Sequence, residues 1–277
     1  MLRNTGVVVF LDIDPFLTER GKPLFRIEEF LAELDERGIP CVWLSERSRA
    51  QLDEPRRKLG HNAPFIAESG SGVYLPEDYF HLKAPRSVRL GRFVCIPIAE
   101  TQPAAEEALE ALSEETGVSV VRLRSLSPRE LAQNTGLPPR EAELARMRDF
   151  SELFFFAGAS EEETDSFVEK AGSRGFVVRR QRALWSLAVG ASTAKAIREA
   201  AGLYDRALRG HAPRIGVAAS AKVKEFAAAC DRIVELRAGQ AEPEAAEQGA
   251  RSVRQFEIAD PELWDRVLGL VSQRTKG

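Results

Sequence analysis

Two aspartates, Asp12 and Asp14, lie at the end of the apolar run 7–11 and are separated by one residue. An uninterrupted apolar run of this length predicts a central strand that is buried on both faces of a parallel sheet. Open α/β sheets bind ligands beyond the carboxyl ends of their strands, so the two carboxylates are candidates for metal or phosphoryl chemistry. One could act as a nucleophile and the other as a proton carrier. The alternative is that Asp14 and Pro15 only form a turn after the strand.

The segments that follow predict the sheet that would position these acids. Apolar residues recur with a helical period over 27–34, and Gly38 closes that helix. A second apolar strand covers 39–44 and ends at Ser45, and a third short strand covers 64–67. The order strand, helix, strand, helix, strand is the start of an α/β, doubly wound, mostly parallel Rossmann-like sheet.

The middle of the chain follows a different pattern. A strand at 90–98 is followed by helices and strands in irregular order, and a hairpin at 176–187 ends this block. After it, Ser192 or Thr193 caps a helix, and strand and helix patterns return. We therefore predict an α+β cap domain inserted into one core domain, with the core formed by 1–85 and 188–277 and the cap by 86–187.

Composition restricts the class of protein and its partners. The 277 residues carry a formal net charge of -3 and a hydrophobic fraction of 44%, which gives no electrostatic reason to expect nucleic acid or a membrane as a partner. The three cysteines (Cys41, Cys95 and Cys230) lack metal-site spacing, so we expect a reduced, cytoplasmic protein. The stretch 238–249 has no apolar period, and we expect a loop or mobile helix on the surface.

The plan of a strand ending in D-x-D, a strand ending in Ser, an inserted cap and a closing strand-helix pair resembles the haloacid dehalogenase superfamily. Within it, the chain is similar to the mannosyl-3-phosphoglycerate phosphatase family. The segments that carry this resemblance are Leu44–Arg49, Pro64–Gly70, Val73–Pro76, Thr135–Leu137 and Arg148–Glu152.

The resemblance implies roles for individual residues. It makes Asp12 the nucleophile that attacks phosphorus, and Asp14 the acid and base. Ser45 would bind the phosphoryl oxygens, and Asp12 and Asp14 would hold a Mg²⁺ cofactor. The expected substrate-binding residues, of which Arg148 and Ser151 face the cleft from the cap, are Ser69, Gly70, Arg148, Ser151 and Ser192.

Several positions depart from the family pattern. Pro15 and Phe16 replace the usual Gly and Thr, and proline removes an N–H from a loop that needs donors for a phosphate. Thr193 stands where a lysine is usual, and Lys195 could substitute only if the helix start shifts. Ala219 and Val223 replace the two acids of the last motif, so the magnesium site is expected to be weak or absent.

Three functions follow as hypotheses. The first is a catalytically impaired pseudo-phosphatase that binds a phosphorylated sugar acid or a protein partner. The second is an active Mg-dependent phosphomonoesterase with an aspartyl-phosphate intermediate and a site rebuilt from Lys195, Lys222 or Glu225. The third is a scaffold with an empty cleft, which the shared presence of Asp12, Asp14 and Ser45 argues against.

Four arginines in the predicted hairpin region have two interpretations. They could form a basic rim that holds an anionic ligand, or they could be a solvated edge, which is the commoner role of such a run. These residues are Arg174, Arg179, Arg180 and Arg182.

Overall fold

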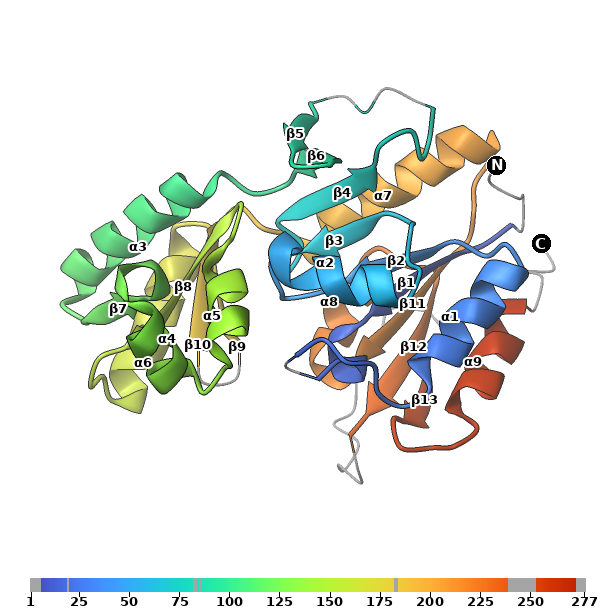
Figure 1. Ribbon diagram of the computed structural model, residues 1–277. Helices are drawn as coiled ribbons and strands as arrows, with labels where there is room; N and C mark the ends of the chain where they lie inside the picture. The colour runs from blue at the N-terminus through green and yellow to red at the C-terminus, as the bar shows by residue number, and fades with distance from the viewer. Residues whose placement is uncertain are drawn as a thin grey trace.

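A computed structural model describes residues 6–18, 20–81, 84, 86–181, 184–238 and 253–272. Within these residues, the strands form one nine-stranded sheet and one four-stranded sheet. Figure 1 shows the larger sheet with its helices beside a smaller α+β unit. The expected loop or helix at 238–249 lies outside the described residues, apart from residue 238.

The larger sheet has β1 near its centre, in the order β13-β12-β11-β1-β2-β3-β4-β6-β5. The strands from β13 to β3 are parallel, and β4, β6 and β5 pair antiparallel. The predicted mostly parallel α/β sheet is thereby confirmed. The strands are β1 Val8–Asp12, β2 Cys41–Leu44, β3 Phe65–Ala67, β4 Gly72–Pro76, β5 Val88–Leu90, β6 Phe93–Pro97, β11 Arg214–Ala219, β12 Arg232–Arg237 and β13 Val253–Glu257.

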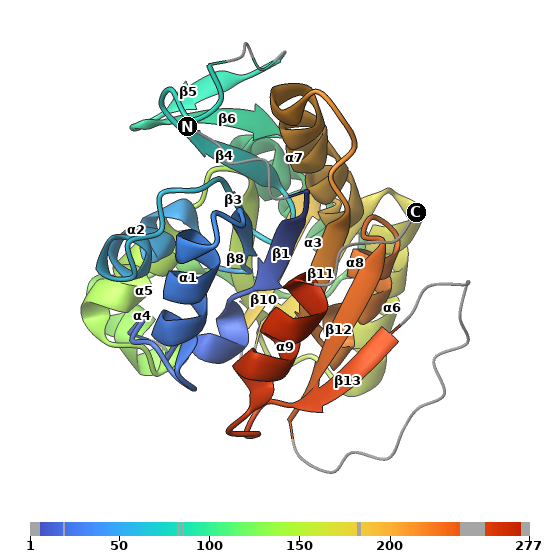
Figure 2. The ribbon, with the colours of Figure 1, turned by 90° about the vertical axis from the view of Figure 1, so that its right-hand side faces the viewer.

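Helices cover both faces of this sheet, because successive strand residues point to opposite sides. Val9 and Leu11 of β1 belong to the hydrophobic cluster formed with α1, α2 and α9, whereas Val8 and Phe10 belong to the cluster formed with α7 and α8. Figure 2 shows α1 and α9 together on one side of the sheet, and α7 with α8 on the other. The helices are α1 Ile27–Glu36, α2 Arg49–Lys58, α7 Thr193–Leu208, α8 Val223–Ala227 and α9 Leu263–Ser272. No helix among the described residues is long and apolar enough to cross a membrane.

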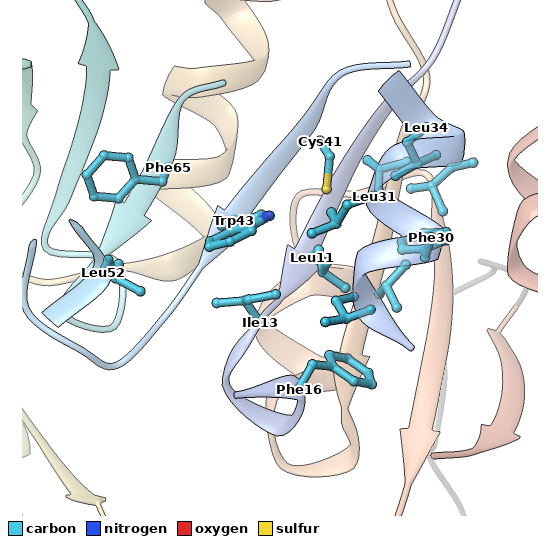
Figure 3. Packing of buried hydrophobic residues seen from close by; sticks show 14 of the residues in the cluster. Leu11, Ile13, Phe16, Phe30, Leu31, Leu34, Cys41, Trp43, Leu52 and Phe65 are labelled. Carbon is cyan, nitrogen blue, oxygen red and sulfur yellow. The ribbon is translucent and has the colours of Figure 1, made fainter. Parts of the chain in front are cut away.

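Phe16, which replaces a hydroxyl residue of the family pattern, is a core residue. Figure 3 shows its ring below Leu11 and Ile13, on the side of the sheet where α1 packs. The ring is fully buried and lies 4.8 Å from the ring of Trp264, which in turn stacks on Phe30 at 4.2 Å. Burying a phenylalanine stabilises a fold by about 1.5–3 kcal/mol, so Phe16 anchors the turn that follows β1.

The smaller unit is a four-stranded antiparallel sheet in the order β7-β8-β10-β9. Helices α3 and α6 pack on one face, and η2, α4 and α5 contribute to a second apolar cluster. The pattern Ser-x-x-Glu beginning at Ser127 and at Ser160 predicts helix starts, and capping boxes are present there at the starts of α4 and α6. The elements are α3 Gln102–Thr116, β7 Val120–Arg122, η2 Leu123–Ser125, α4 Pro128–Thr135, α5 Pro139–Arg146, β8 Ser151–Phe156, α6 Glu161–Ser173, β9 Phe176–Gln181 and β10 Leu184–Val189.

Strands β5 and β6, which fall in the range 86–187 that we expected to form the cap, pair within the larger sheet. The expected single strand at 90–98 is two strands, β5 and β6, joined by a turn at Gly91 (φ +60°); β6 pairs with β4, and β5 pairs with β6 at the sheet edge. The chain therefore first leaves the larger sheet after β6. It returns after β10, where the N–H of Glu100 donates to the carbonyl of Val189 (2.9 Å) and holds the two connections side by side. That the two units are separate domains stays a prediction.

Candidate active site

Asp12 and Asp14 lie where β1 ends in one turn of 3₁₀ helix. Asp12 is the last residue of the strand and is fully buried, and η1 (Asp14–Phe16) starts two residues later. Proline fits this turn because its fixed φ suits the first positions of a helix. With Phe16 anchored in the core, the Pro15-Phe16 pair leaves the connection after the strand intact.

Lys222 reaches both aspartates from η3 (Ser220–Lys222), the turn that follows β11. Its Nζ lies 2.9 Å from Oδ1 of Asp12, 3.1 Å from Oδ2 of Asp14 and 3.2 Å from Oε1 of Glu46. The contact arises because β11 pairs parallel with β1, so the carboxyl ends of the two strands meet at one edge of the sheet. One ammonium group thereby joins three carboxylates.

Both carboxylate oxygens of Asp14 are engaged by the segment after β2. The hydroxyl of Ser45 donates to Oδ1, the backbone N–H of Glu46 donates to Oδ2 (2.8 Å), and Nε of Arg47 lies 3.6 Å from Oδ1. The Ser45 hydroxyl also accepts from the backbone N–H of Arg47 (3.1 Å). Ser45 is therefore close to the aspartates, as predicted, but its hydroxyl is already paired within the protein.

The surroundings separate the pKa values of the two aspartates. Burial raises the pKa of Asp12 to about 6, although Lys222 acts in the opposite direction. Burial would also raise the pKa of Asp14, but Lys222, Arg47 and the hydrogen bonds from Ser45 and Glu46 together lower it. Burial alone would lower the pKa of Lys222, but the three surrounding carboxylates raise it well above its ordinary value. Asp14 and Lys222 are thus charged at neutral pH.

Lys195, the expected replacement for the family lysine, points elsewhere. Ser192 caps α7 by accepting from the backbone N–H of Lys195 (3.2 Å), and the Lys195 side chain is exposed. Thr193 is buried and lines the cavity described below. Since one residue along a helix turns by about 100°, Lys195 lies about 200° from Thr193 around the axis, and the ammonium beside the aspartates is that of Lys222.

Arg148 and Ser151 bind Glu68 of the larger unit, whereas we expected them to contact a ligand. The hydroxyl of Ser151 donates to Oε2 of Glu68 (2.6 Å), and Nε of Arg148 donates to Ser151 Oγ (2.6 Å). The backbone N–H groups of Asp149 and Phe150 also donate to the Glu68 carboxylate, at 2.7 and 3.1 Å. A buried carboxylate needs such donors, so these residues join the two units in this conformation.

Ser69 and Gly70 follow Glu68 and lie beside the start of α7. Both adopt positive φ values (+57° and +90°). A Cβ on Gly70 would lie 2.5 Å from the backbone nitrogen of Thr193, so only glycine allows this approach. Unlike Arg148 and Ser151, these two predicted binding residues line the cavity.

A small cavity lies between the two units at the carboxyl ends of the strands. Its volume is about 20 Å³, which is enough for roughly one water molecule. Within the described residues, Oδ2 of Asp12, Oγ of Ser69 and Nε of Arg179 are buried polar atoms without a hydrogen-bond partner. The residues lining the cavity are Leu44, Ser45, Glu46, Ser69, Gly70, Arg179, Thr193, Lys222, Glu225 and Phe226.

The residues at this site do not fit a magnesium ion. Magnesium requires near-octahedral oxygen ligation, with carboxylates that are free to approach the ion. Here Nζ of Lys222 lies within 3.2 Å of the three carboxylates, and Ala219 and Val223 supply no ligand oxygen from their side chains. The described part of the chain contains no group of three or more His, Cys, Asp or Glu residues that could hold a metal.

Sequence reasoning underestimated Lys222 and missed Glu46, and it considered Arg179 only as one of four arginines that could form a basic rim or a solvated edge. Lys222 was one of three candidates for a rebuilt site, and its position in the last motif, where an Asn is usual, was the available signal. Glu46 follows Ser45 directly and so reaches the same strand end. Arg179 lies on β9 opposite Ser186 of β10, and the alternation of this strand turns it away from the cap helices.

The fold and the strand-end residues define the class of protein. A parallel sheet carrying Asp-x-Asp after β1 and Ser after β2, with a smaller α+β unit inserted over that edge, is the plan of the haloacid dehalogenase superfamily. The comparisons with solved structures agree at the level of the fold. A superfamily phosphatase from Bacteroides thetaiotaomicron aligns with a TM-score of 0.62 at 16% identity over 98% of this chain and 97% of that one. A subclass IIB sugar phosphatase aligns with a TM-score of 0.60 at 16% identity over 96% of this chain and 100% of that one.

Curated relatives narrow the class to one family. A mannosyl-3-phosphoglycerate phosphatase of Pyrococcus furiosus is 30% identical over 175 residues, which cover 62% of this chain and 71% of the relative. A glucosyl-3-phosphoglycerate/mannosyl-3-phosphoglycerate phosphatase of Methanococcoides burtonii is 24% identical over 198 residues, covering 71% of this chain and 72% of that protein. No protein-family model matches the chain. The chain belongs to the mannosyl-3-phosphoglycerate phosphatase family of the haloacid dehalogenase superfamily.

Proposed function

We propose that this protein binds a phosphorylated sugar acid between its two units and has lost most or all of the magnesium-dependent phosphatase activity of its family. The observation that carries the proposal is the position of Lys222, whose ammonium contacts Asp12, Asp14 and Glu46 at 2.9–3.2 Å. A fixed positive charge there competes with any divalent cation. The names of the relatives, which specify mannosyl- and glucosyl-3-phosphoglycerate, support the ligand class.

The ionisation of the aspartates also opposes catalysis. A phosphatase of this plan needs an ionised nucleophile at Asp12 and a protonated acid at Asp14 to release the leaving alcohol. The pKa of Asp12 is raised to about 6, so Asp12 is still mostly ionised at neutral pH, whereas the pKa of Asp14 is lowered, which opposes its role as a proton donor. Losing one preorganised charge-stabilising group typically costs about 10²–10³ in rate, and the family lysine and two acids are all replaced.

Unpaired polar atoms support ligand binding. Buried polar atoms in proteins are nearly always hydrogen-bonded, and atoms without a partner near a cavity indicate an absent polar ligand or water. Ser69 and Arg179 line the cavity, and the unpaired Oδ2 of Asp12 belongs to the carboxylate that Lys222 contacts. A sugar acid does not fit a cavity of about 20 Å³, so binding requires the smaller unit to move away from the sheet.

A second candidate is the magnesium-dependent phosphomonoesterase with an aspartyl-phosphate intermediate. In its favour, the Lys222 ammonium lies beside the expected nucleophile, where it could neutralise phosphoryl oxygens. This candidate requires Lys222 to release Asp14 and Glu46. We also infer a cytoplasmic location, since Cys41, Cys95 and Cys230 are all buried thiols.

Phosphate release separates the two candidates. The substrates are mannosyl-3-phosphoglycerate and an aryl phosphate, in millimolar magnesium or EDTA, with Asp12→Asn as the control. We expect turnover at least about a thousandfold below the ordinary enzyme rate of about 10 per second. Turnover at ordinary rates that requires magnesium and disappears in Asp12→Asn would overturn the proposal and establish the phosphatase.

A further inference from the structure

Arg179 is a charged residue that the smaller unit places in the cavity. It lies on β9, directly opposite Ser186 of β10. Val177, two residues earlier on the same face of β9, packs against the apolar cluster of the larger sheet, whereas Val178 packs on the cap helices. The alternation of the strand therefore turns Arg179 toward the larger unit, and the residue lines the cavity together with Ser45, Ser69 and Lys222.

The guanidinium group of Arg179 is incompletely paired within the described residues. Its Nη1 donates to Oε1 of Glu225, on α8 of the larger unit, but its Nε is buried and has no hydrogen-bond partner. A guanidinium presents five N–H donors in a planar fork that matches a carboxylate in a bidentate arrangement. The single contact with Glu225 leaves part of this fork unused.

Glu225 lies where it can act as an internal substitute for a ligand anion. The side chains of Glu225 and Arg179 are each 27% exposed, and both residues line the cavity. Lys222 is already surrounded by three carboxylates, so Arg179 is the cavity cation with donors to spare. The ion pair also crosses from one unit to the other, so a ligand that enters the cavity must separate it or replace one of its members.

We infer that Arg179 recognises the carboxylate of the phosphorylated acid, which displaces Glu225 from the guanidinium. This inference rests on the proposed function and adds a determinant of ligand choice to it: phosphate esters that carry a carboxylate bind better than esters that lack one. Glu225 weakens binding by competing for the same donors. Because the interaction is charge-assisted and partly buried, its loss should change affinity by about tenfold or more.

The test compares two phosphate esters that differ at one carbon. Glycerol 3-phosphate carries a hydroxymethyl group where 3-phosphoglycerate carries the carboxylate, and calorimetry at fixed ionic strength in EDTA gives a dissociation constant for each. We expect the wild-type protein to prefer 3-phosphoglycerate about tenfold, and Arg179→Gln to remove that preference with little effect on glycerol 3-phosphate. Glu225→Gln should strengthen binding of 3-phosphoglycerate several-fold.

Two further variants make the result specific. Arg179→Lys keeps the charge without the planar fork and should retain only part of the preference. Arg180→Gln changes the neighbouring, exposed arginine on the other face of β9 and should leave the preference unchanged. If both esters bind but the preference is absent, or survives in Arg179→Gln, the inference is wrong and the proposed function stands. If neither ester binds at millimolar concentration, the proposed function fails, and the inference with it.

Discussion

Replacing Lys222 by methionine should expose the electrostatic cost that this residue offsets. Methionine approximates the length of the lysine side chain but removes the charge, leaving Asp12, Asp14 and Glu46 around the vacated position. Removing one partner of a buried ion pair typically costs about 3–5 kcal/mol. We expect the free energy of unfolding to fall by about 3 kcal/mol at pH 7. The lower end applies because Asp14 and Glu46 are 20% and 31% exposed and are partly screened by water.

The loss should be smaller at about pH 5. In the wild-type protein, burial raises the pKa of Asp12 to about 6 from its ordinary value of 3.8, and removing the ammonium raises it further. An acid whose pKa is raised in the folded state stabilises the fold when it is protonated. This stabilisation is complete below pH 3.8 and is lost as the pH rises through about 6. At about pH 5 the variant binds a proton at Asp12 and no longer holds an unpaired charge there. The remaining loss comes from Asp14, whose pKa is lowered in the wild-type protein.

Magnesium should stabilise the variant and not the wild-type protein. With the ammonium removed, three carboxylates face a space that a divalent cation can enter. A ligand at a hundred times its dissociation constant stabilises a fold by about 2.7 kcal/mol, a shift that urea unfolding measures readily. This result would identify Lys222 as the group that excludes the metal.

Urea unfolding of both proteins at the two pH values, with magnesium or EDTA, provides the measurement. Lys224→Met is the matched control, because Lys224 is exposed on the following turn and should change stability by less than about 0.5 kcal/mol. A loss below about 1 kcal/mol at pH 7, or an equal loss at both pH values, would refute the counterion role of Lys222. Equal effects of magnesium on both proteins would refute the exclusion of the metal.

Three further predictions concern single side chains. Asp12→Asn should stabilise the protein at pH 7 by about 1–3 kcal/mol. A pKa raised from 3.8 to about 6 means that keeping Asp12 ionised costs about 3 kcal/mol in the folded state. If urea unfolding shows no gain in stability at pH 7, this prediction is wrong. Glu68→Gln should lower the free energy of unfolding by about 2–4 kcal/mol and speed proteolysis between the two units, because an amide cannot accept from all the donors that now bind the carboxylate. Unchanged digestion would show that Glu68 does not hold the two units together. Gly72→Ala should cost about 1–3 kcal/mol in urea unfolding, because its Cβ would lie 2.5 Å from the Phe150 ring, whereas Gly269→Ala in α9 has open space and should be neutral or stabilising.

The parts of the fold that the sequence predicted are those with strong local signals. The apolar run before Asp12 is a central strand, the serines at 127 and 160 cap helices, and the segment 176–187 is a hairpin. Each signal depends on residues within a few positions of one another. Strands β5 and β13 gave no such signal, because most of their side chains are exposed or half-buried at the sheet edges and show no alternation.

Only the site residues that lie at the ends of strands could be predicted from the sequence. Asp12, Asp14 and Ser45 meet because neighbouring parallel strands end at the same edge. The pairing of Glu68 with Arg148 and Ser151 joins residues about eighty positions apart, and neither segment shows which donors the other supplies. The sequence predicted that this loop faces the cleft, but it could not show that the donors of the loop pair with Glu68.

The lysine at 222 and the missing acids at 219 and 223 are best understood as one change. Carboxylates added at 219 and 223 while Lys222 remains would bring further negative charge to this site. The Lys222 ammonium there already pairs with three carboxylates. Val223 is buried in the apolar cluster beneath α7 and α8, so an aspartate there also carries the cost of burying a charge without a metal to pair with it. Acids added at 219 and 223 therefore cannot restore metal binding while Lys222 remains. Removing the lysine has to come first, because only then do Asp12, Asp14 and Glu46 need an external cation.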